Sequence, residues 1–134
     1  MSQTAAGQGA LARQQMVSAK QPESTDRVLD RVHLSHYTMN NVALEREIID
    51  LFRGQLPILV GRIRQTCSPG EWKFATHTLK GSAAAIGACK LNDLARELEA
   101  AEAFCDEDIR QKLLFELDEA AQEFELLVQR LYCR

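Results

Sequence analysis

A histidine, a lysine and a glycine stand close together at His77, Lys80 and Gly81, inside the run EWKFATHTLKGSAAAIGACK. Apolar residues recur around them at helical spacing, so we predict that all three lie on one amphipathic helix. An unprotonated imidazole is a nucleophile that can carry a group covalently, and a lysine one turn away can attract an anion on the ring. A glycine inside a helix costs about 1 kcal/mol relative to alanine, which indicates that an incoming molecule needs the space. Together these residue types suit phosphoryl transfer.

The helical repeat predicts that His77 faces solvent. Successive residues turn by about 100° around a helix, which puts the apolar Ala75, Leu79 and Ile86 about 160 to 200° away from the histidine. The residues expected within about 40 to 60° of His77 are Lys73, Phe74, Lys80, Gly81, Ala84 and Ala88. We expect the two lysines to supply positive charge, and we expect a partner protein to dock on a shallow surface formed by Lys73, Phe74, Ala84 and Ala88.

Composition narrows the possible classes of protein. The chain has 134 residues, of which 46% are hydrophobic, and this is enough for one domain with a real core. A net charge of −3 argues against general nucleic-acid binding. No apolar run reaches the roughly 18 residues that span a bilayer, and no signal peptide is visible, so we expect a cytoplasmic protein that does not enter membranes. The four cysteines contain no CxxC pair, and we expect them to be small, partly buried hydrophobic residues.

The apolar repeats predict an all-α fold, an antiparallel up-and-down four-helix bundle with a short extra N-terminal helix. The predicted helices cover residues 28–37, 42–66, 69–88, 91–101 and 109–131, within a bundle domain over 26–134 that follows a flexible tail over 1–25. Asn40-Asn41 and Ser68 are helix start signals, and Glu71 is placed to complete a capping box with Ser68. Pro57 lies inside the second helix, where we predict a bend rather than an end.

The run His77-Thr78-Leu79-Lys80-Gly81-Ser82, with Ile86-Gly87-Ala88 after it, resembles the histidine-containing phosphotransfer (HPt) family. The similarity continues through Leu91, Leu94 and Leu98-Glu99, and it spans roughly Leu29 to the C-terminus. The resemblance implies a four-helix bundle whose second main helix exposes the phosphorylatable histidine, here His77. It also carries over Lys80 and Gly81 as the other motif residues. Some members have a polar side chain near the site, where this chain has Ala84 and Ala85.

The resemblance implies a phosphorelay carrier of two-component signalling. Such domains accept a phosphoryl group from the aspartate of one response-regulator receiver domain and pass it to another. The expected partners are therefore receiver domains, of a hybrid histidine kinase and of a downstream regulator. The receiver would bring an acidic pocket and Mg²⁺, so the chain needs no cofactor of its own. No glycine-rich nucleotide loop is visible, so we expect a monomeric phosphotransfer intermediate rather than an ATP-dependent kinase.

Other interpretations use some of the same residues. A helical adaptor or inhibitor that docks a receiver domain or a histidine kinase without phosphotransfer is the main alternative, although an adaptor would not need the imidazole. A hydrolytic enzyme would need a triad, yet Thr76 and Thr78 point about 100° away from His77. His33 and His36 form an HxxH pair, but a metal site needs further ligands and none stands out nearby, so we predict no metal site.

Overall fold

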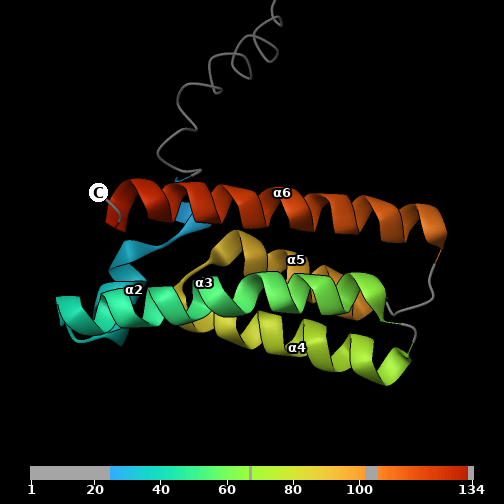
Figure 1. Cartoon of the computed structure of the whole chain (residues 1–134), viewed down its shortest axis with the longest axis horizontal. Coiled ribbons are helices and arrows are strands. Elements are labelled where there is room, and N and C mark those ends of the chain that lie inside the picture. The colour runs from blue at the N-terminus through green and yellow to red at the C-terminus, as the bar shows by residue number, and fades with distance from the viewer. Residues whose placement is uncertain (1–24, 67, 102–105, 133–134) are drawn as a thin grey trace, which may run out of the picture.

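The computed structural model describes residues 25–66, 68–101 and 106–132, and the regular structure of these residues is entirely helical (Figure 1). The elements are α2 (Arg31–Tyr37), α3 (Val42–Gln65), α4 (Pro69–Ile86), α5 (Cys89–Ala101) and α6 (Glu107–Tyr132). A single helical turn over residues 25–28 precedes α2. The tail predicted over residues 1–25 lies outside the described residues, apart from Thr25.

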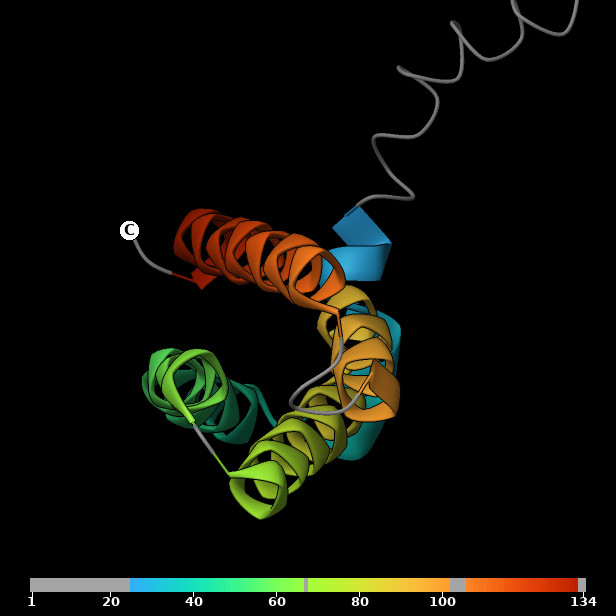
Figure 2. The ribbon, with the colours of Figure 1, turned by 90° about the vertical axis from the view of Figure 1, so that its right-hand side faces the viewer.

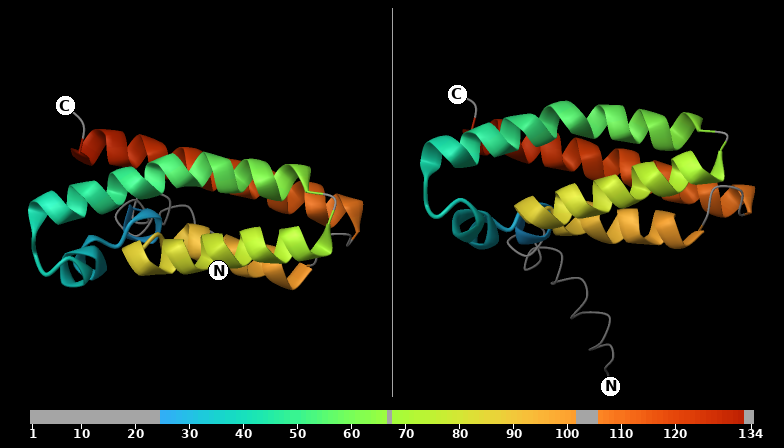
Figure 3. Two further views of the ribbon diagram at one scale, coloured as in Figure 1. Left: turned by 60° about the horizontal axis from the view of Figure 1, so that its bottom comes forward. Right: turned by 90° about the horizontal axis from the view of Figure 1, so that it is seen from below.

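The four long helices run alternately up and down and form a bundle (Figures 1 and 2). Each packs against the helix that follows it in the chain, and α6 closes the bundle by packing against α3. The short α2 lies at the end of the bundle where α4 stops and α5 begins, and it packs against α4 (Figure 3). The predicted fold, an antiparallel four-helix bundle with a short extra N-terminal helix, is confirmed.

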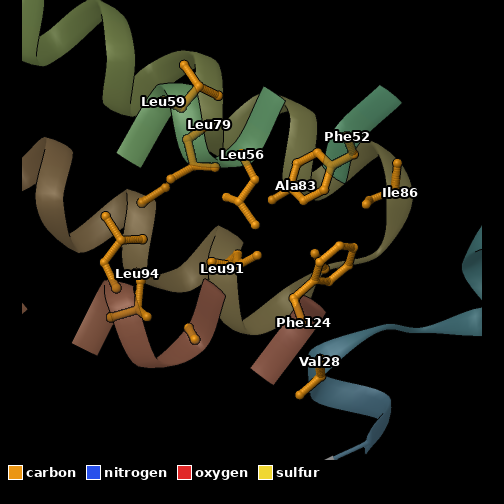
Figure 4. Packing of buried hydrophobic residues seen from close by; sticks show 14 of the residues in the cluster. Val28, Phe52, Leu56, Leu59, Leu79, Ala83, Ile86, Leu91, Leu94 and Phe124 are labelled. Atoms are coloured by element: carbon orange, nitrogen blue, oxygen red, sulfur yellow. The ribbon is translucent and has the colours of Figure 1, made fainter. Parts of the chain in front are cut away.

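Apolar side chains from all four long helices meet along the bundle axis (Figure 4). Phe52 of α3 packs edge-to-face on Phe124 of α6, with 5.1 Å between the ring centroids. The residues that α4 contributes to this core are Trp72, Ala75, Leu79, Ala83 and Ile86. Burying a large apolar side chain stabilises the fold by about 1.5–3 kcal/mol, so this stripe determines how α4 is rotated about its axis. The opposite face of α4 is thereby turned toward solvent.

Side-chain hydrogen bonds cap the starts of α3 and α4 at the residues that the sequence predicts. The Asn41 side chain accepts a hydrogen bond from the Leu44 N–H at 3.0 Å, and α3 then runs through Pro57 as one helix. Ser68 caps α4 by accepting from the Glu71 N–H at 3.3 Å. The second half of the predicted capping box differs, because the Glu71 carboxylate accepts from the Thr66 hydroxyl at 2.9 Å instead.

The end of α4 differs from the prediction. The helix stops at Ile86 rather than near Ala88, because Gly87 adopts the left-handed conformation with φ +88°. A Cβ atom on Gly87 would stand 2.9 Å from the Asp30 carbonyl oxygen, so the close approach of the α2 segment also requires a glycine. The Asp30 N–H donates to the Gly87 carbonyl at 2.8 Å and ties the two segments together.

The predicted helix over residues 28–37 is interrupted. Leu29 and Asp30 are not helical, and the Asp30 carboxylate caps α2 by accepting from the His33 N–H at 3.1 Å. Because the helical repeat is broken at Leu29 and Asp30, the apolar residues before and after the break do not share one helix face. Leu29 and Leu34 enter the core, whereas Val32, which the prediction counted among the apolar repeats, is 70% exposed.

Candidate functional site

His77 projects from the middle of α4 into solvent, as the helical repeat predicts. The His77 side chain is 68% exposed, while Thr76 next to it is fully buried. The rotation of α4 explains this arrangement, because Trp72, Leu79 and Ala83 occupy the core on the other side of the helix. A partner molecule can therefore reach the imidazole without any rearrangement of the bundle.

One carboxylate connects the histidine to the lysine. Glu99 of α5 places Oε2 3.3 Å from His77 Nδ1 and Oε1 2.8 Å from Lys80 Nζ. An ionised carboxylate only accepts hydrogen bonds, so the ring nitrogen that faces it carries the hydrogen. In a neutral ring that makes this hydrogen bond, Nδ1 is the donor and Nε2 carries the lone pair.

Glu99 remains ionised to lower pH than an ordinary glutamate. The hydrogen bond from Lys80 is the main cause that lowers the pKa of the Glu99 carboxyl, and the hydrogen bond from His77 adds to it. Lys80 itself is only 30% exposed, and its ammonium is committed to this ion pair. The positive charge that the sequence places beside the ring is therefore shared with an anion.

Gly81 lies on the exposed surface of α4. A Cβ atom at this position would meet nothing within 4 Å outside its own neighbourhood in the helix. The packing of the bundle therefore does not require glycine here, and neither does the backbone, since Gly81 is an ordinary helical residue. The described residues therefore give no structural reason for a glycine at this position.

Three of the four predicted docking residues lie on the surface. Lys73, Phe74 and Ala84 are exposed, and Phe74 has 63% of its area in solvent. Ala88 does not belong to this surface, because it is fully buried. The prediction extended the helical repeat past Gly87, where α4 has already ended and the chain turns inward.

The neighbouring face of α3 continues the surface around Phe74. The residues that line a groove between α3 and α4 are Arg62, Gln65, Thr66, Glu71, Phe74 and Ala75. Ile58 lies one turn before Arg62, and His77 lies about one turn after Phe74, so the antiparallel pair brings Ile58 to the level of the histidine. Ile58 is 59% exposed and Leu51, two turns earlier, is 69% exposed. The sequence alone did not identify these α3 residues.

The other candidate residues make contacts of their own. The Thr76 hydroxyl donates to the Trp72 carbonyl at 2.9 Å, so it is no partner for His77 in a triad. His33 Nε2 lies 2.9 Å from the Ala85 carbonyl oxygen, which ties α2 to α4. Within the described ranges, no three His, Cys, Asp or Glu residues gather as metal ligands would.

Two further predictions concern the cysteines and the membrane. Cys89 is a free thiol and is partly buried, as expected. Burial raises the pKa of this thiol. The other three cysteines, Cys67, Cys105 and Cys133, lie outside the described residues. No helix in the described part of the chain has the length and apolar character needed to cross a bilayer.

Glu99 is the site residue that sequence reasoning missed. A signal for it exists, because His77 precedes Ala88 by 11 residues and Glu99 follows Ala88 by 11. In an antiparallel helix pair that turns near Ala88, residues at equal distances from the turn face each other. The motif residues on α4 therefore indicate where on α5 to look for a partner.

The fold and the site together define a class of protein. The chain is an all-α bundle with an exposed histidine in the middle of α4, beside a lysine and a glycine. The model of the Hpt domain family matches residues 47–131, more than half of the chain, and the chain belongs to this family. No curated protein and no solved structure matches it. Hpt domains carry phosphoryl groups in two-component signalling, interact with receiver domains, and are not kinases with ATP sites.

Proposed function

We propose that this chain is a phosphorelay carrier that accepts a phosphoryl group on His77 from a receiver-domain aspartate and passes it to a second receiver. The observation that carries the proposal is the geometry of the His77 ring. Its Nδ1 faces the Glu99 carboxylate at 3.3 Å, and the side chain is 68% exposed, so Nε2 is free to act as the nucleophile. The cytoplasm is the compartment in which we expect this exchange.

The chemistry requires little from the chain beyond position and charge. His77 Nε2 attacks the phosphorus of the aspartyl phosphate, the bond between phosphorus and the aspartate oxygen breaks, and the aspartate leaves as a carboxylate. The reverse sequence returns the group to a second receiver. Phosphoryl transfer has a loose transition state, so catalysis consists mostly of alignment and electrostatic stabilisation. The receiver is expected to bring its acidic pocket and Mg²⁺.

Lys80 and Gly81 suit the two remaining requirements. The Lys80 ammonium lies on the same face as the ring, one turn later, and can compensate the charge of the phosphoryl oxygens. Gly81 leaves open space on that face, where a side chain would stand against an approaching receiver. Lys73 lies one turn before His77 and extends the positive charge.

The docking surface that we propose has an apolar part and a charged part. Phe74, Ile58 and Leu51 form the apolar part on the α3 side of His77, and all three are more than half exposed. Lys73, Lys80 and Glu99 form the charged part on the α5 side. Exposed apolar residues that gather beside a reactive group indicate a protein-binding surface. We propose that a receiver domain docks there, with a monomer of this chain as its partner.

The test starts from a purified receiver domain that has been phosphorylated on its aspartate in the presence of Mg²⁺. We expect wild-type chain to acquire an acid-labile label, and His77→Ala to acquire none. His36→Ala is the matched control, because His36 is also an exposed histidine on a helix, and it should be labelled like wild type. A parallel sample receives ATP alone, and it should remain unlabelled.

The other outcomes are equally informative. Labelling of His77→Ala would overturn the proposal, because another residue would then be the acceptor. A stable complex with the receiver that never passes the label would instead favour the helical adaptor. Label acquired from ATP alone would reveal a kinase activity that the proposal excludes.

A further inference from the structure

A second exposed apolar surface lies on α6. The side chains of Phe115 and Leu126 are exposed there, with 62% and 58% of their area in solvent. Because they are 11 residues apart on one helix, they point in the same direction to within about 20° and lie about 16 Å apart along its axis. The helix packs against α3 and α5 and lies across the bundle from α4, which carries His77 (Figure 2). This surface is therefore separate from the docking surface around His77.

A shallow groove between α5 and α6 begins beside Leu126. The residues that line it are Lys90, Glu119, Gln122, Glu123 and Leu126. An ion pair of 2.7 Å joins Lys90 to Glu123, so these two charges compensate each other. Among the residues that the structure describes, Glu119 has no ion-pair partner. The groove thus combines an apolar residue with one uncompensated carboxylate.

The segment before Thr25 joins the bundle close to this groove. Arg27 forms an ion pair with Asp93 of α5, and Asp93 lies one turn after Lys90 on the same helix. Nine residues separate Thr25 from Met16, and nine residues of chain can span up to about 30 Å. Met16 can accordingly reach the groove.

The same segment has the composition that such a groove would bind. Residues 1–22 contain two basic residues, Arg13 and Lys20, and no Asp or Glu. The large apolar residues that follow position 10 in this stretch are Leu11, Met16 and Val17. The segment therefore offers apolar side chains and positive charge to a surface that has exposed apolar side chains and negative charge.

The spacing of the two sets of apolar residues also agrees. Leu11 and Met16 are five residues apart, which an extended chain covers in about 16–18 Å. Phe115 and Leu126 are separated by about the same distance along α6. Arg13 lies between the two apolar residues of the segment, as the uncompensated carboxylate of the groove lies between the two of α6. Opposite charges can therefore meet while both apolar pairs are in contact.

We propose that residues 11–20 dock in the groove between α5 and α6 of the same chain, with Met16 against Leu126 and Leu11 against Phe115. A second copy of the chain is a poorer occupant, because a stable protein interface buries about 1,200 Å² or more and two exposed side chains supply only a small part of that area. A segment of the same chain needs less area, since its linkage keeps it near the groove at a millimolar effective concentration. Docking there leaves His77 open to its partner.

Limited trypsin digestion of the full chain tests this docking. Trypsin cleaves after Arg13 and Lys20, and a docked segment is cleaved only through its open form. We expect Leu126→Gln to accelerate cleavage after Arg13 by about three- to tenfold. Ile109→Gln is the matched control, because Ile109 is an exposed apolar residue of α6 that points about 100° away from Leu126. It should be cleaved like wild type, and circular dichroism should show the same helical content in all three proteins.

A second measurement leaves the sequence of the bundle intact and changes only the segment. Amide ¹H–¹⁵N NMR spectra of the full chain are compared between wild type, Met16→Ser and Ala6→Ser. We expect Met16→Ser to shift the amide signals of residues 119–126 and to leave those around His77 unchanged. Ala6→Ser is the control, because position 6 lies outside the proposed docking segment, and it should shift neither set.

Several results would overturn the inference. One is an equal rate of cleavage after Arg13 in wild type and Leu126→Gln, and another is a spectrum of Met16→Ser in which residues 119–126 do not shift. Shifts confined to the signals around His77 would place the segment on the proposed receiver-docking surface instead. Protection from trypsin that grows with protein concentration would show that a second copy supplies the segment. None of these results depends on phosphoryl transfer, so the proposed function is tested separately.

Discussion

At the scale of single residues, the motif contains two groups whose roles can be separated. In the proposed mechanism, His77 supplies the nitrogen that bonds to phosphorus, whereas Gly81 contributes only the space left by its missing side chain. No contact among the described residues requires a glycine here, since a Cβ atom at Gly81 would meet open space. The helix would in fact be more stable with alanine there. The proposed function gives the glycine a use, because it leaves room for a receiver domain at a cost to the stability of its own helix.

We therefore predict that substitutions of Gly81 can stabilise the fold and yet impair phosphoryl transfer. Gly81→Ala should raise the free energy of unfolding, by up to about 1 kcal/mol, because alanine favours the helix. Gly81→Leu should keep the helical content but block transfer from a phosphorylated receiver. Urea unfolding measures the first effect, and label transfer measures the second.

The control for Gly81→Leu is its reaction with phosphoramidate, a donor small enough to reach the ring past a leucine. We expect this reaction to survive the substitution, which would separate a docking defect from a damaged histidine. If the leucine variant accepted label from the receiver as fast as wild type, the open space at Gly81 would have no role in docking.

At the scale of the helices, ion pairs between neighbours help to align the bundle. Arg53 of α3 binds Glu125 of α6 through two hydrogen bonds, of 3.1 Å from Nε and 2.6 Å from Nη2. This contact is the main cause that lowers the pKa of the Glu125 carboxyl. The Arg53 side chain is 25% exposed and that of Glu125 is 39% exposed, so solvent screens part of the attraction.

The pair predicts a specific dependence of stability on pH. The pKa of Glu125 is lower in the folded state than in the unfolded state. The stabilisation from its charge is therefore present above the unfolded pKa of about 4.3 and is lost as the pH falls through the folded pKa. Glu125→Gln should lower the free energy of unfolding by about 0.5–1 kcal/mol at pH 7. The difference from wild type should vanish in strong acid.

Urea unfolding of both proteins at pH 7 and near pH 2 checks this prediction. Glu119→Gln is the matched control, because Glu119 is an exposed carboxylate on the same helix, and its substitution should have little effect at either pH. A deficit of Glu125→Gln that stays the same size in acid would mean that the charge of Glu125 is not what stabilises the bundle.

The helices also show which features a sequence can predict. Asn41 and Ser68 begin their helices through hydrogen bonds to residues three positions later, so their signals are local and readable. The end of α4 was harder to predict. Gly87 stops the helix because it adopts φ +88° against Asp30, and that contact joins segments more than 50 residues apart. The helical repeat alone does not reveal this contact, so it continues past Gly87 and predicts an exposed Ala88. In the structure Ala88 is buried.

At the scale of the whole molecule, the site is assembled from three helices. The motif on α4 could be recognised in sequence, because His77, Lys80 and Gly81 lie within five residues. Glu99 and Ile58 lie outside the motif, and the packing of α5 and α3 against α4 brings them beside it. The equal spacing of His77 and Glu99 from Ala88 points to Glu99 only when α4 and α5 are taken as an antiparallel pair that turns near Ala88. The rotation of α4 itself was predictable, since its apolar stripe is regular and the core simply buries it.

The bundle as a whole presents its three histidines differently. His77 offers Nε2 to solvent, whereas Nε2 of His33 is occupied by the Ala85 carbonyl at 2.9 Å. His36 lies in the last turn of α2, on a different helix from the motif. If the site works as proposed, a phosphoryl donor should distinguish not only among these residues but also between the two nitrogens of one ring.

The most direct test of the central claim is therefore to locate the phosphoryl group by heteronuclear ³¹P and ¹⁵N NMR in the full chain after reaction with a phosphorylated receiver. We predict a single bond between phosphorus and Nε2 of His77, with the hydrogen retained on Nδ1. A phosphoryl group on Nδ1 of His77, or on His33 or His36, would contradict it.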